Sequence, residues 1–496
     1  ISAMNADLVL DHLVITQTFG NPIMARYSDV VLTNSELHSE VTGDLINVKY
    51  GTARIENCKF TGNNMPDTDA IDYDEVIGGV IRNVSINGFY GFNSDAVDIG
   101  EEAEDVTIDS IVVYNITDKG ISLGQLSTAT VSNSIFINCN LGVAVKDSST
   151  AIINNSVFYN NVYPVACYEK NVGLAGGNAS VRNSILSNYA ESIYLQDERS
   201  TIRFSHTLAD GNDSIPGNEN LLGDPLFREP SYFDFELNSS SPAILSGIDS
   251  NGNPVNIGTQ LSIADFEPTV MITEFFVNAP DGLLPEYIKV YNPTDKTVNA
   301  SGYYIDKGIT ATIPEGTIIN PGRHLYLTSD ASDYLWDGVI VPVIQWEDGH
   351  LSNNGEAIRL LDDHGIVLDH FRYDINGDWP AEGFGIDRAF VLRDLSLDNH
   401  FGKNWSSEIL SNLVGDLPVK MKGEGMKVYP NPGNGIITIE CSDQTVNQVR
   451  VFDIRGALLT TIQLDYSGTA HPDLSSLGNG MYILKAGDNV EKIIIR

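Results

Sequence analysis

The chain has 496 residues, and 42% of them are hydrophobic, which is enough to build the cores of about three domains. Its 66 Asp and Glu residues outnumber 29 Lys and Arg residues, so the net charge is −37. Such a charge repels phosphate backbones and anionic membrane surfaces. The composition therefore excludes nucleic acid as a partner and favours divalent cations.

The four cysteines predict buried thiols rather than a metal site. Cys58, Cys139, Cys167 and Cys441 show no CxxC spacing and no nearby histidine cluster, which argues against zinc. No apolar run approaches the length of about 18 residues needed to span a membrane, and the first four residues do not resemble a signal peptide. Because residues 8–11 already have the pattern of a coil, we expect the chain to begin inside a solenoid, with further sequence upstream.

A repeat organises the first half of the chain. The stretch Asp69-Ala70-Ile71-Asp72-Tyr73-Asp74 returns 26 residues later around Asp95-Ala96-Val97-Asp98-Ile99. A second mark, an Asn or Asp among alternating apolar residues, recurs every 22 to 28 residues at Asp11, Asn34, Asn57, Asn83, Asp109, Asn133, Asn155 and Asn183. Loose periods of about 20 to 30 residues indicate a solenoid.

The solenoid is predicted to be a parallel β-helix over residues 1–266, with coils from about residue 7 to residue 205. Helical and leucine-rich repeats are disfavoured because Gly, Asn, Ser and Thr interrupt every segment. In a β-helix, equivalent residues stack in columns about 4.8 Å apart, so a column of asparagines satisfies the backbone groups of successive turns.

The second strand of each coil predicts two outward columns of acidic side chains. The residues expected to point inward are Ile46, Val48, Ile71, Tyr73, Val97, Ile99, Ile121, Leu123, Val143, Val145, Val165 and Cys167. Period-two geometry then places Asn47, Asp72, Asp98 and Ser122 outward in one column, and Asp44, Asp69 and Asp95 form another at the preceding turn.

These carboxylates are open to three interpretations. Stacked Asp72 and Asp98 repel each other unless one is protonated or a cation bridges them. The first interpretation is a solvated acidic surface with turn-capping aspartates. The second is a calcium site, because calcium prefers hard oxygen ligands; its predicted ligands are Asp69, Asp72, Asp95 and Asp98, with further oxygens from Asn47, Asp74, Glu101, Glu102 and Asp118.

The third interpretation is catalysis on the β-helix. The scaffold resembles β-helix polysaccharide lyases, in which calcium on stacked carboxylates neutralises a uronate and a Lys or Arg abstracts the proton. Lys119 and Lys146 lie in later coils near the acidic face, yet no recognised lyase or hydrolase block surrounds them. A glycosidase would use the pair Asp72 and Asp98 or the pair Asp69 and Asp95. The repeats resemble more closely the β-helix found downstream of CotH-type kinase domains, which implies that any catalytic part lies upstream.

After the coils, residues 234–237 and Ser241-Pro242-Ala243-Ile244 resemble the closing coil of bacterial right-handed β-helix proteins, in which such a segment caps the core. A second unit follows over residues 268–412. Its blocks Ile272-Thr273-Glu274-Phe275, Glu286-Tyr287-Ile288-Lys289-Val290-Tyr291-Asn292 and Asn354-Gly355-Glu356-Ala357-Ile358-Arg359-Leu360 resemble the lamin-tail domain, which implies an immunoglobulin-like β-sandwich. Lys289 departs from the family pattern and is expected to face solvent. The tryptophans Trp336, Trp346, Trp379 and Trp405 are expected to pack in the core rather than to stack on sugar.

Residues 413–425 have the composition of a linker, and residues 426–496 predict a second small β-sandwich. The blocks Val428-Tyr429-Pro430-Asn431-Pro432, Val449-Arg450-Val451-Phe452-Asp453-Ile454-Arg455-Gly456, Gly480-Met481-Tyr482-Ile483-Leu484 and Lys492-Ile493-Ile494-Ile495-Arg496 resemble the type A C-terminal sorting domain of type IX secretion, the export route of Bacteroidota. The resemblance implies docking onto an outer-membrane β-barrel shuttle and removal by a sortase-like peptidase. The signal residues it implies are Tyr429, Pro430, Asn431, Pro432, Asp453, Gly456, Gly480, Tyr482, Lys492 and Arg496. The apolar run Ile493-Ile494-Ile495 between the last two is expected to form an exposed terminal strand that a partner recognises.

Together these patterns predict an all-β protein: a right-handed parallel β-helix followed by two immunoglobulin-like sandwiches. The expected function is that of an exported cell-surface or secreted protein, non-enzymatic over these residues, which uses the β-helix and the lamin-tail module for binding or adhesion, with polysaccharide as a candidate partner. The alternative is a carbohydrate-active enzyme, a polysaccharide lyase or glycoside hydrolase acting on the β-helix face.

Overall fold

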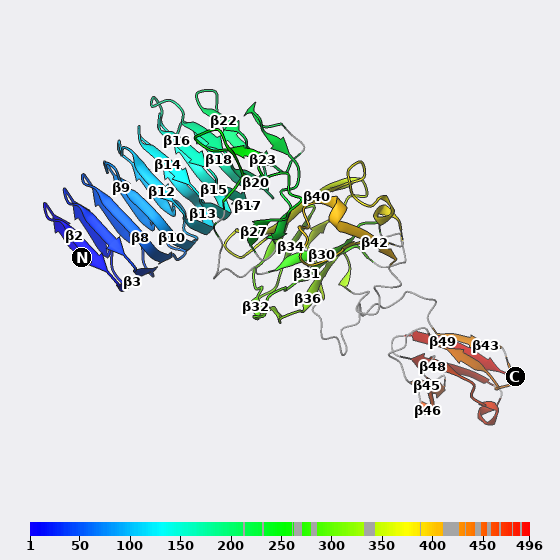
Figure 1. The fold of residues 1–496 in the computed structure, drawn as a ribbon. Helices are drawn as coiled ribbons and strands as arrows, with labels where there is room; N and C mark the ends of the chain where they lie inside the picture. Colours follow the sequence, from blue (N-terminus) through cyan, green and yellow to red (C-terminus); the bar gives the residue numbers. More distant parts are fainter. Residues whose placement is uncertain are drawn as a thin grey trace.

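The computed structural model shows a β-helix followed by two smaller β units (Figure 1). It describes residues 1–496 apart from 212–213, 231–232, 260, 262–269, 279–284, 332–342, 387, 410–425, 432, 442–447, 454–457, 466–467, 479 and 487–488. For residues 453, 458, 481 and 489–492 only the backbone is described. The predicted linker at 413–425 lies outside the described residues, as does the predicted boundary between the β-helix and the second unit.

Three parallel sheets, here called A, B and C, form the wall of the β-helix, and long strands pass from one sheet into the next. Sheet A contains β2 (Leu8–Asp11), β5 (Val30–Thr33), the first halves of β8 (Ala53–Thr61) and β10 (Val80–Phe89), β12 (Val106–Asp109), β14 (Thr128–Ser132), β16 (Thr150–Asn154), β19 (Asn178–Arg182), β22 (Thr201–Ser205) and β24 (Gly217–Asn218).

Sheets B and C complete each coil. Sheet B contains β3 (Val14–Gln17), β6 (Glu36–Ser39), the second halves of β8 and β10, the first halves of β13 (Val112–Leu123) and β15 (Ile135–Lys146), β17 (Val157–Tyr159), β20 (Ile185–Ser187), β23 (Leu208–Ala209) and β25 (Leu221–Leu222). Sheet C contains β1 (Ser2–Met4), β4 (Ile23–Arg26), β7 (Ile46–Lys49), β9 (Ile71–Asp74), β11 (Val97–Gly100), the second halves of β13 and β15, β18 (Tyr163–Tyr168) and β21 (Tyr194–Gln196).

Alternating apolar residues fill the inside of the β-helix, as the sequence predicts. All twelve side chains expected to point inward from sheet C are at most 1% exposed. Their columns continue around the coil, where Phe136 and Phe158 stack with ring centroids 4.9 Å apart. Cys58, Cys139 and Cys167 are buried thiols within this core, and Cys441 is buried in the last unit, so the prediction of buried cysteines is confirmed.

The asparagine marks form a turn column, with a shift at two positions. Residues in the left-handed region follow sheet A in successive coils at His12, Asn34, Asn57, Asn83, Ser110, Asn133, Asn155, Asn183 and His206. Asparagine tolerates this conformation, and its amide bridges coils: Asn83 donates to Asn57 Oδ1 at 2.7 Å. Asp11 and Asp109 lie one residue earlier, and each accepts a hydrogen bond from the Asn of the next coil.

The segment predicted to cap the core covers the side of the β-helix instead. This segment contains β26 (Phe227–Glu229), β27 (Asp234–Leu237), β28 (Gly247–Ile248) and β29 (Pro254–Val255). Phe235 and Ala243 pack against Ile135 and Tyr159, which lie on the outer face of sheet B. This face is apolar and needs cover along its length, so the closing segment protects it rather than the inner core of the last coil.

The second unit is a two-sheet sandwich, which confirms the predicted fold. One sheet has the order β37-β36-β31-β30-β41-β42 and the other β38-β34-β33-β39-β40. The strands are β30 (Met271–Phe276), β31 (Tyr287–Tyr291), β32 (Val298–Asn299), β33 (Tyr304–Lys307), β34 (Ile309–Thr312), β35 (Ile318–Ile319), β36 (His324–Thr328), β37 (Val343–Gln345), β38 (Asp348–Gly349), β39 (Gly355–Leu361), β40 (Val367–Asp374), β41 (Arg388–Leu392) and β42 (Trp405–Ile409), with 3-10 turns at Ala381–Phe384 and Gly402–Asn404.

Aromatic packing fills this sandwich. Trp346, Trp379 and Trp405 are at most 7% exposed, so the prediction that they pack in the core is confirmed, whereas Trp336 lies outside the described residues. The prediction for Lys289 is wrong. Its side chain is only 16% exposed, because its ammonium group pairs with Glu274 at 3.2 Å across neighbouring antiparallel strands.

The last unit is a second two-sheet sandwich with its own core. Sheets β43-β44-β47 and β46-β45-β48-β49 face each other across buried Ile439, Val451 and Leu484. The strands are β43 (Lys427–Tyr429), β44 (Thr438–Glu440), β45 (Gln448–Asp453), β46 (Leu458–Gln463), β47 (Thr469–Ala470), β48 (Gly480–Ala486) and β49 (Asn489–Ile495), with a 3-10 turn at Ser475–Leu477. Within the described part of the chain, no helix is long and apolar enough to cross a membrane.

Candidate functional site

The predicted acidic column lies on the outer face of sheet C. Strand register pairs Asn47 with Asp72, Asp72 with Asp98 and Asp98 with Ser122, as the alternation predicts. Inward Ile and Val residues on either side fix this orientation, because a shift of one residue would move the apolar set to the surface. Sequence and structure therefore agree on which carboxylates stack.

The second acidic column joins successive turns through the backbone. Asp44 Oδ1 accepts the backbone N–H of Asp69 at 3.2 Å, and Asp69 Oδ1 accepts that of Asp95 at 2.6 Å. Asp95 Oδ1 in turn accepts the backbone N–H of Lys119 at 3.1 Å. One oxygen of each of these aspartates thus caps the turn of the next coil, which is the structural role that the first interpretation gives them.

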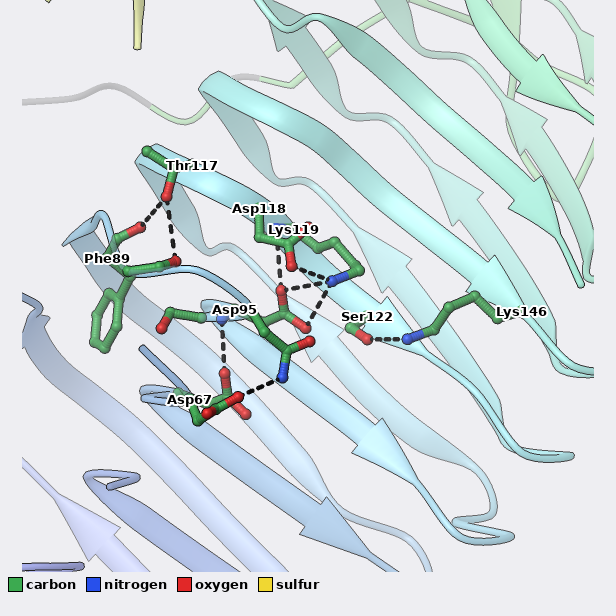
Figure 2. Close-up of polar contacts among 12 residues, drawn as sticks. Asp67, Phe89, Asp95, Thr117, Asp118, Lys119, Ser122 and Lys146 are labelled. Carbon is green, nitrogen blue, oxygen red and sulfur yellow. Dashed lines mark hydrogen bonds and ion pairs between the residues drawn. The ribbon is translucent and has the colours of Figure 1, made fainter. Parts of the chain in front are cut away.

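Lys119 neutralises the end of this turn column (Figure 2). Its ammonium group lies 3.2 Å from Asp95 Oδ1 and 2.5 Å from Asp118 Oδ2, and the residue is 4% exposed. Burial lowers the pKa of Lys119, but the attraction of Asp95 and Asp118 outweighs burial and raises it. Burial raises the pKa of Asp95 to about 6 against the opposing effect of Lys119. At pH 7 the pair is ionised, so Lys119 is unsuited to act as a general base.

Lys146 lies at the end of the strand column. Figure 2 shows it reaching back to the preceding coil, where its Nζ lies 2.6 Å from Ser122 Oγ. Gly124 leaves room for this path, since a Cβ there would lie 3.3 Å from Lys146 Cε. Burial lowers the pKa of Lys146, although Asp98 and Asp95 oppose the shift. Ser122 is fully buried, so this contact closes the column and leaves the hydroxyl inaccessible to substrate.

The surroundings of Asp72 strongly disfavour its charged form. Burial, followed by the charges of Asp74, Asp44 and Asp98, raises the pKa of Asp72 to about 9. Asn47 donates to Asp72 and also to Asp44, at 3.1 Å in the second contact, while Asp74 pairs with Lys49. This shift favours the protonated form of Asp72, and protonation is one of the two ways of relieving the repulsion in the column that the sequence leaves open.

The four predicted calcium ligands lie on one face but carry other contacts. Asp69 and Asp95 cap turns, Asp72 accepts from Asn47, and Asp95 pairs with Lys119. A cation bound there must displace Asn47 or Lys119, or use the oxygens that remain. Of the further predicted ligands, Asp74 and Asp118 also pair with lysines, whereas Glu101 and Glu102 are exposed. The oxygen chemistry fits Ca²⁺ better than a transition metal, and calcium binding at Asp69, Asp72, Asp95 and Asp98 stays a prediction.

A compact set of ligand-type side chains that the sequence reasoning missed lies in the second unit. Among the described residues, Asp362, Asp363 and His364 have ligand atoms within 4.8 Å of one another. They follow β39 in a tight turn, and the ring of His364 stacks on Tyr90 of the β-helix with centroids 4.1 Å apart. The signal in the sequence is the contiguous Asp-Asp-His-Gly run, which lies outside the repeats of the β-helix.

The predicted sorting residues gather where the first and last strands of the last unit meet. Asn431 Oδ1 accepts the backbone N–H of Ile494 at 3.0 Å, and the backbone N–H of Arg496 donates to Gly433 O at 2.9 Å. Tyr429 is 46% exposed and donates to Glu440. Pro430 follows Tyr429, while Pro432 and Gly456 lie outside the described residues.

The other sorting residues lie on the opposite sheet, and one expectation about them is wrong. Asp453 in β45 pairs with Tyr482 in β48, which also contains Gly480, and Lys492 lies in β49. The terminal apolar run was expected to be exposed. Ile493 and Ile495 are instead 1% and 3% exposed, because alternate residues of β49 face the sandwich core.

Comparison with known proteins supports the three-part organisation. Residues 5–174 and 76–221 match the right handed beta helix region, and residues 266–374 match the Lamin Tail Domain. Residues 427–496 match the secretion system C-terminal sorting domain. A search of curated proteins found no match to the chain. The chain therefore combines a right-handed β-helix, a lamin-tail domain and a C-terminal sorting domain, and the sorting domain marks it as cargo that type IX secretion exports to the cell surface or the medium.

Proposed function

We propose that the exported protein is a non-enzymatic binding or adhesion module, in which the β-helix and the lamin-tail domain act as one body on a polysaccharide partner. The observation that carries this proposal is the joint between the two domains. Two modules that shared only a tether would move independently, whereas packed modules present one continuous surface.

The joint is built around a buried histidine of the lamin-tail domain. His370 lies in β40, and its Nε2 is 2.5 Å from the backbone oxygen of Tyr189 in the β-helix. Its Nδ1 is 3.2 Å from Asn160 Oδ1, and Asn160 Nδ2 donates to Val367 O at 2.5 Å. Buried hydrogen bonds of this kind fix orientation, because leaving any of these groups unpaired is costly.

Charged and aromatic contacts extend the joint on both sides. Glu191 of the β-helix pairs with Arg359 and, at 3.5 Å, with Lys307 of the lamin-tail domain. Asp224 pairs with Lys403 at 2.7 Å. These pairs and the stacking of Tyr90 on His364 occupy separate positions along the interface, which supports a single rigid body.

The alternative function, a lyase or glycoside hydrolase on the acidic face, has one observation in its favour. Burial lowers the pKa of Lys146, and a lysine with a lowered pKa beside carboxylates is a known form of general base. Against it, Lys146 is 4% exposed and contacts a fully buried serine. The structural interpretation of the acidic columns accounts for more of these contacts.

Two further parts of the proposal concern export and calcium. We propose that residues 426–496 dock onto an outer-membrane β-barrel shuttle of the type IX machinery. Ca²⁺ is the proposed cation of the acidic face, held by oxygens of Asp69, Asp72, Asp95 and Asp98, where it would offset the excess of negative charge.

The test is a binding and cleavage screen with the full chain. Retention on immobilised neutral and uronate polysaccharides is measured together with the release of reducing ends and of unsaturated products. Retention without cleavage is the expected result. Cleavage that is lost in Lys146→Met or Asp98→Asn would favour the enzymatic alternative, and failure to be retained on any polysaccharide or cell surface would refute the binding function.

A further inference from the structure

A large cleft lies at the joint between the β-helix and the lamin-tail domain. Its volume is about 1070 Å³, and side chains of both domains line it. Typical small-molecule sites span about 300 to 1,000 Å³, so the cleft has room for a ligand of several rings. It lies apart from the acidic columns of sheet C, whose carboxylates do not line it.

Two polar atoms in the lining of this cleft have no hydrogen-bond partner in the described part of the chain. One is Oδ1 of Asp210, at the end of the β-helix, and the other is Nδ1 of His400, in the lamin-tail domain. Asp210 is 8% exposed, and its other oxygen already accepts hydrogen bonds from Ser187 at 2.8 Å and from the backbone N–H of Asn188 at 2.5 Å. Buried polar groups in native proteins are rarely left unpaired. Both side chains line the cleft, and the charge of His400 acts on Asp210, so a polar group bound beside them would have two unpaired buried atoms to satisfy.

The charge of the lining differs from that of the rest of the chain. Four basic side chains, Lys307, Arg359, Arg372 and Lys403, face five acidic ones here, whereas the whole chain has 29 basic and 66 acidic residues. Arg372 is exposed at the rim. An acidic ligand is therefore repelled far less in this cleft than elsewhere on the surface.

An aromatic ring completes the lining. Phe401 lies beside His400, with ring centroids 5.4 Å apart, and Lys403 Nζ lies 5.1 Å from the centre of the Phe401 ring. A half-buried ring next to hydrogen-bonding groups provides an apolar platform with polar neighbours. This combination suits a ligand that presents both C–H faces and hydroxyl groups.

We infer that this cleft binds an oligosaccharide segment, whose hydroxyl groups pair with Asp210 and His400 while Arg372 and Lys403 contact its oxygens. Hydroxyl groups fit because each both donates and accepts a hydrogen bond, so one sugar ring serves an acceptor carboxylate and an imidazole nitrogen alike. The inference rests on the proposed binding function and names its site and ligand class.

The experiment measures binding of two probes to the full chain by isothermal titration calorimetry: cello-oligosaccharide as the neutral probe and oligogalacturonate as the uronate probe. The cleft variants are Asp210→Asn, which keeps the shape and removes the charged acceptor, and Arg372→Ala at the exposed rim. The control is Arg203→Ala, an exposed arginine on β22 of the β-helix that does not line the cleft. The melting temperature of each variant shows that it is folded.

The expected result is binding of at least one probe that weakens about tenfold in each cleft variant and is unchanged in Arg203→Ala. Weakening in Arg372→Ala that is larger for oligogalacturonate than for cello-oligosaccharide would assign a uronate ligand, and equal weakening a neutral one. Binding that survives both cleft variants would overturn the site while leaving the binding function standing. Absence of binding to both probes, in a protein still retained on cell surfaces, would overturn the ligand class alone.

Discussion

Asp72 and Asp98 are register partners on adjacent parallel strands, so two carboxylates stack on the same outer face of the β-helix. The pKa of Asp72 rises to about 9, chiefly through burial and then through the charges of Asp74, Asp44 and Asp98. The column therefore favours the protonated form of Asp72 at neutral pH. The stability of the β-helix should depend on pH for this reason.

The first prediction is that Asp72→Asn stabilises the β-helix at neutral and alkaline pH. The folded-state pKa lies above the unfolded value of about 3.9, so the folded state binds more protons between pH 4 and pH 9. The contribution of Asp72 to the free energy of unfolding is largest below pH 4 and falls as the pH rises towards 9. Asn removes that loss and keeps an acceptor for Asn47. The expected gain is about 1 to 3 kcal/mol at pH 8 and close to zero at pH 4, measured by urea denaturation. The control is exposed Asp7→Asn. A gain that is independent of pH would contradict the assignment.

The second prediction is that Ca²⁺ raises the melting temperature of the full chain and that a chelator reverses the effect. Binding only to the folded state stabilises by mass action, by about 2.7 kcal/mol at a hundredfold excess over Kd. The gain should disappear in the double variant Asp69→Asn and Asp98→Asn. It should persist in Asp363→Asn, which disrupts the compact acidic set of the lamin-tail domain. An unchanged melting temperature with and without chelator would refute calcium binding, and loss of the effect only in Asp363→Asn would move the site to the lamin-tail domain.

The third prediction contrasts the two buried lysines. Lys119→Met leaves Asp95 buried without its cation, and breaking such a pair costs about 3 to 5 kcal/mol. Lys146→Met removes a buried charge and one hydrogen bond to Ser122 but keeps the packing of the stem, so its effect should stay within about 1 kcal/mol. Urea denaturation of the β-helix transition measures both. Equal destabilisation by the two substitutions would show that the charge of Lys146 also holds the column together.

Much of the β-helix was predictable because its contacts repeat at short sequence separation. The alternation around Asp72 and Asp98 determines which side chains point outward, and the period determines which of them stack. The sequence did not predict that Asp11 and Asp109 lie one residue before the turn position that the asparagines occupy. Aspartate and asparagine look alike as polar marks in the repeat, but of the two only asparagine adopts the left-handed conformation at this turn.

The missed parts of the structure depend on contacts between distant segments. His370 and Asn160 are separated by 210 residues, and no periodicity links them. The same holds for the cleft lined by Asp210 and His400, since it exists only once the two domains have docked. Lys289 was expected at the surface, but a neighbouring antiparallel strand supplies its partner, Glu274. The local sequence pattern does not specify this strand pairing.

The last prediction concerns export. Deleting residues 426–496 should trap the protein in the periplasm of a bacterium with type IX secretion, because the sorting domain carries the transport signal. Deleting only Lys492 to Arg496 should have the same effect, but this change also removes Ile493 and Ile495 from the sandwich core, so loss of export would not by itself separate recognition from folding. Arg496→Glu separates recognition from folding. Arg496 is exposed and lies outside the core, so replacing its side chain leaves no cavity.

The measurement is the fraction of protein on the cell surface and in the medium relative to the periplasm, by cell fractionation and by protease accessibility on whole cells. A reduced exported fraction for Arg496→Glu, with an unchanged melting transition of the sorting domain, would place the terminal cation in the recognised surface. The control Leu459→Ser alters an exposed side chain on edge strand β46 of the same sandwich and should export normally. Undiminished surface display after deletion of residues 426–496 would refute the assignment of this domain as the signal. A third outcome is that Arg496→Glu is exported normally while the full deletion is not exported. This would place recognition on the folded sandwich, away from the last residue. Only the deletion removes the paired edge formed by Asn431, Gly433 and β49.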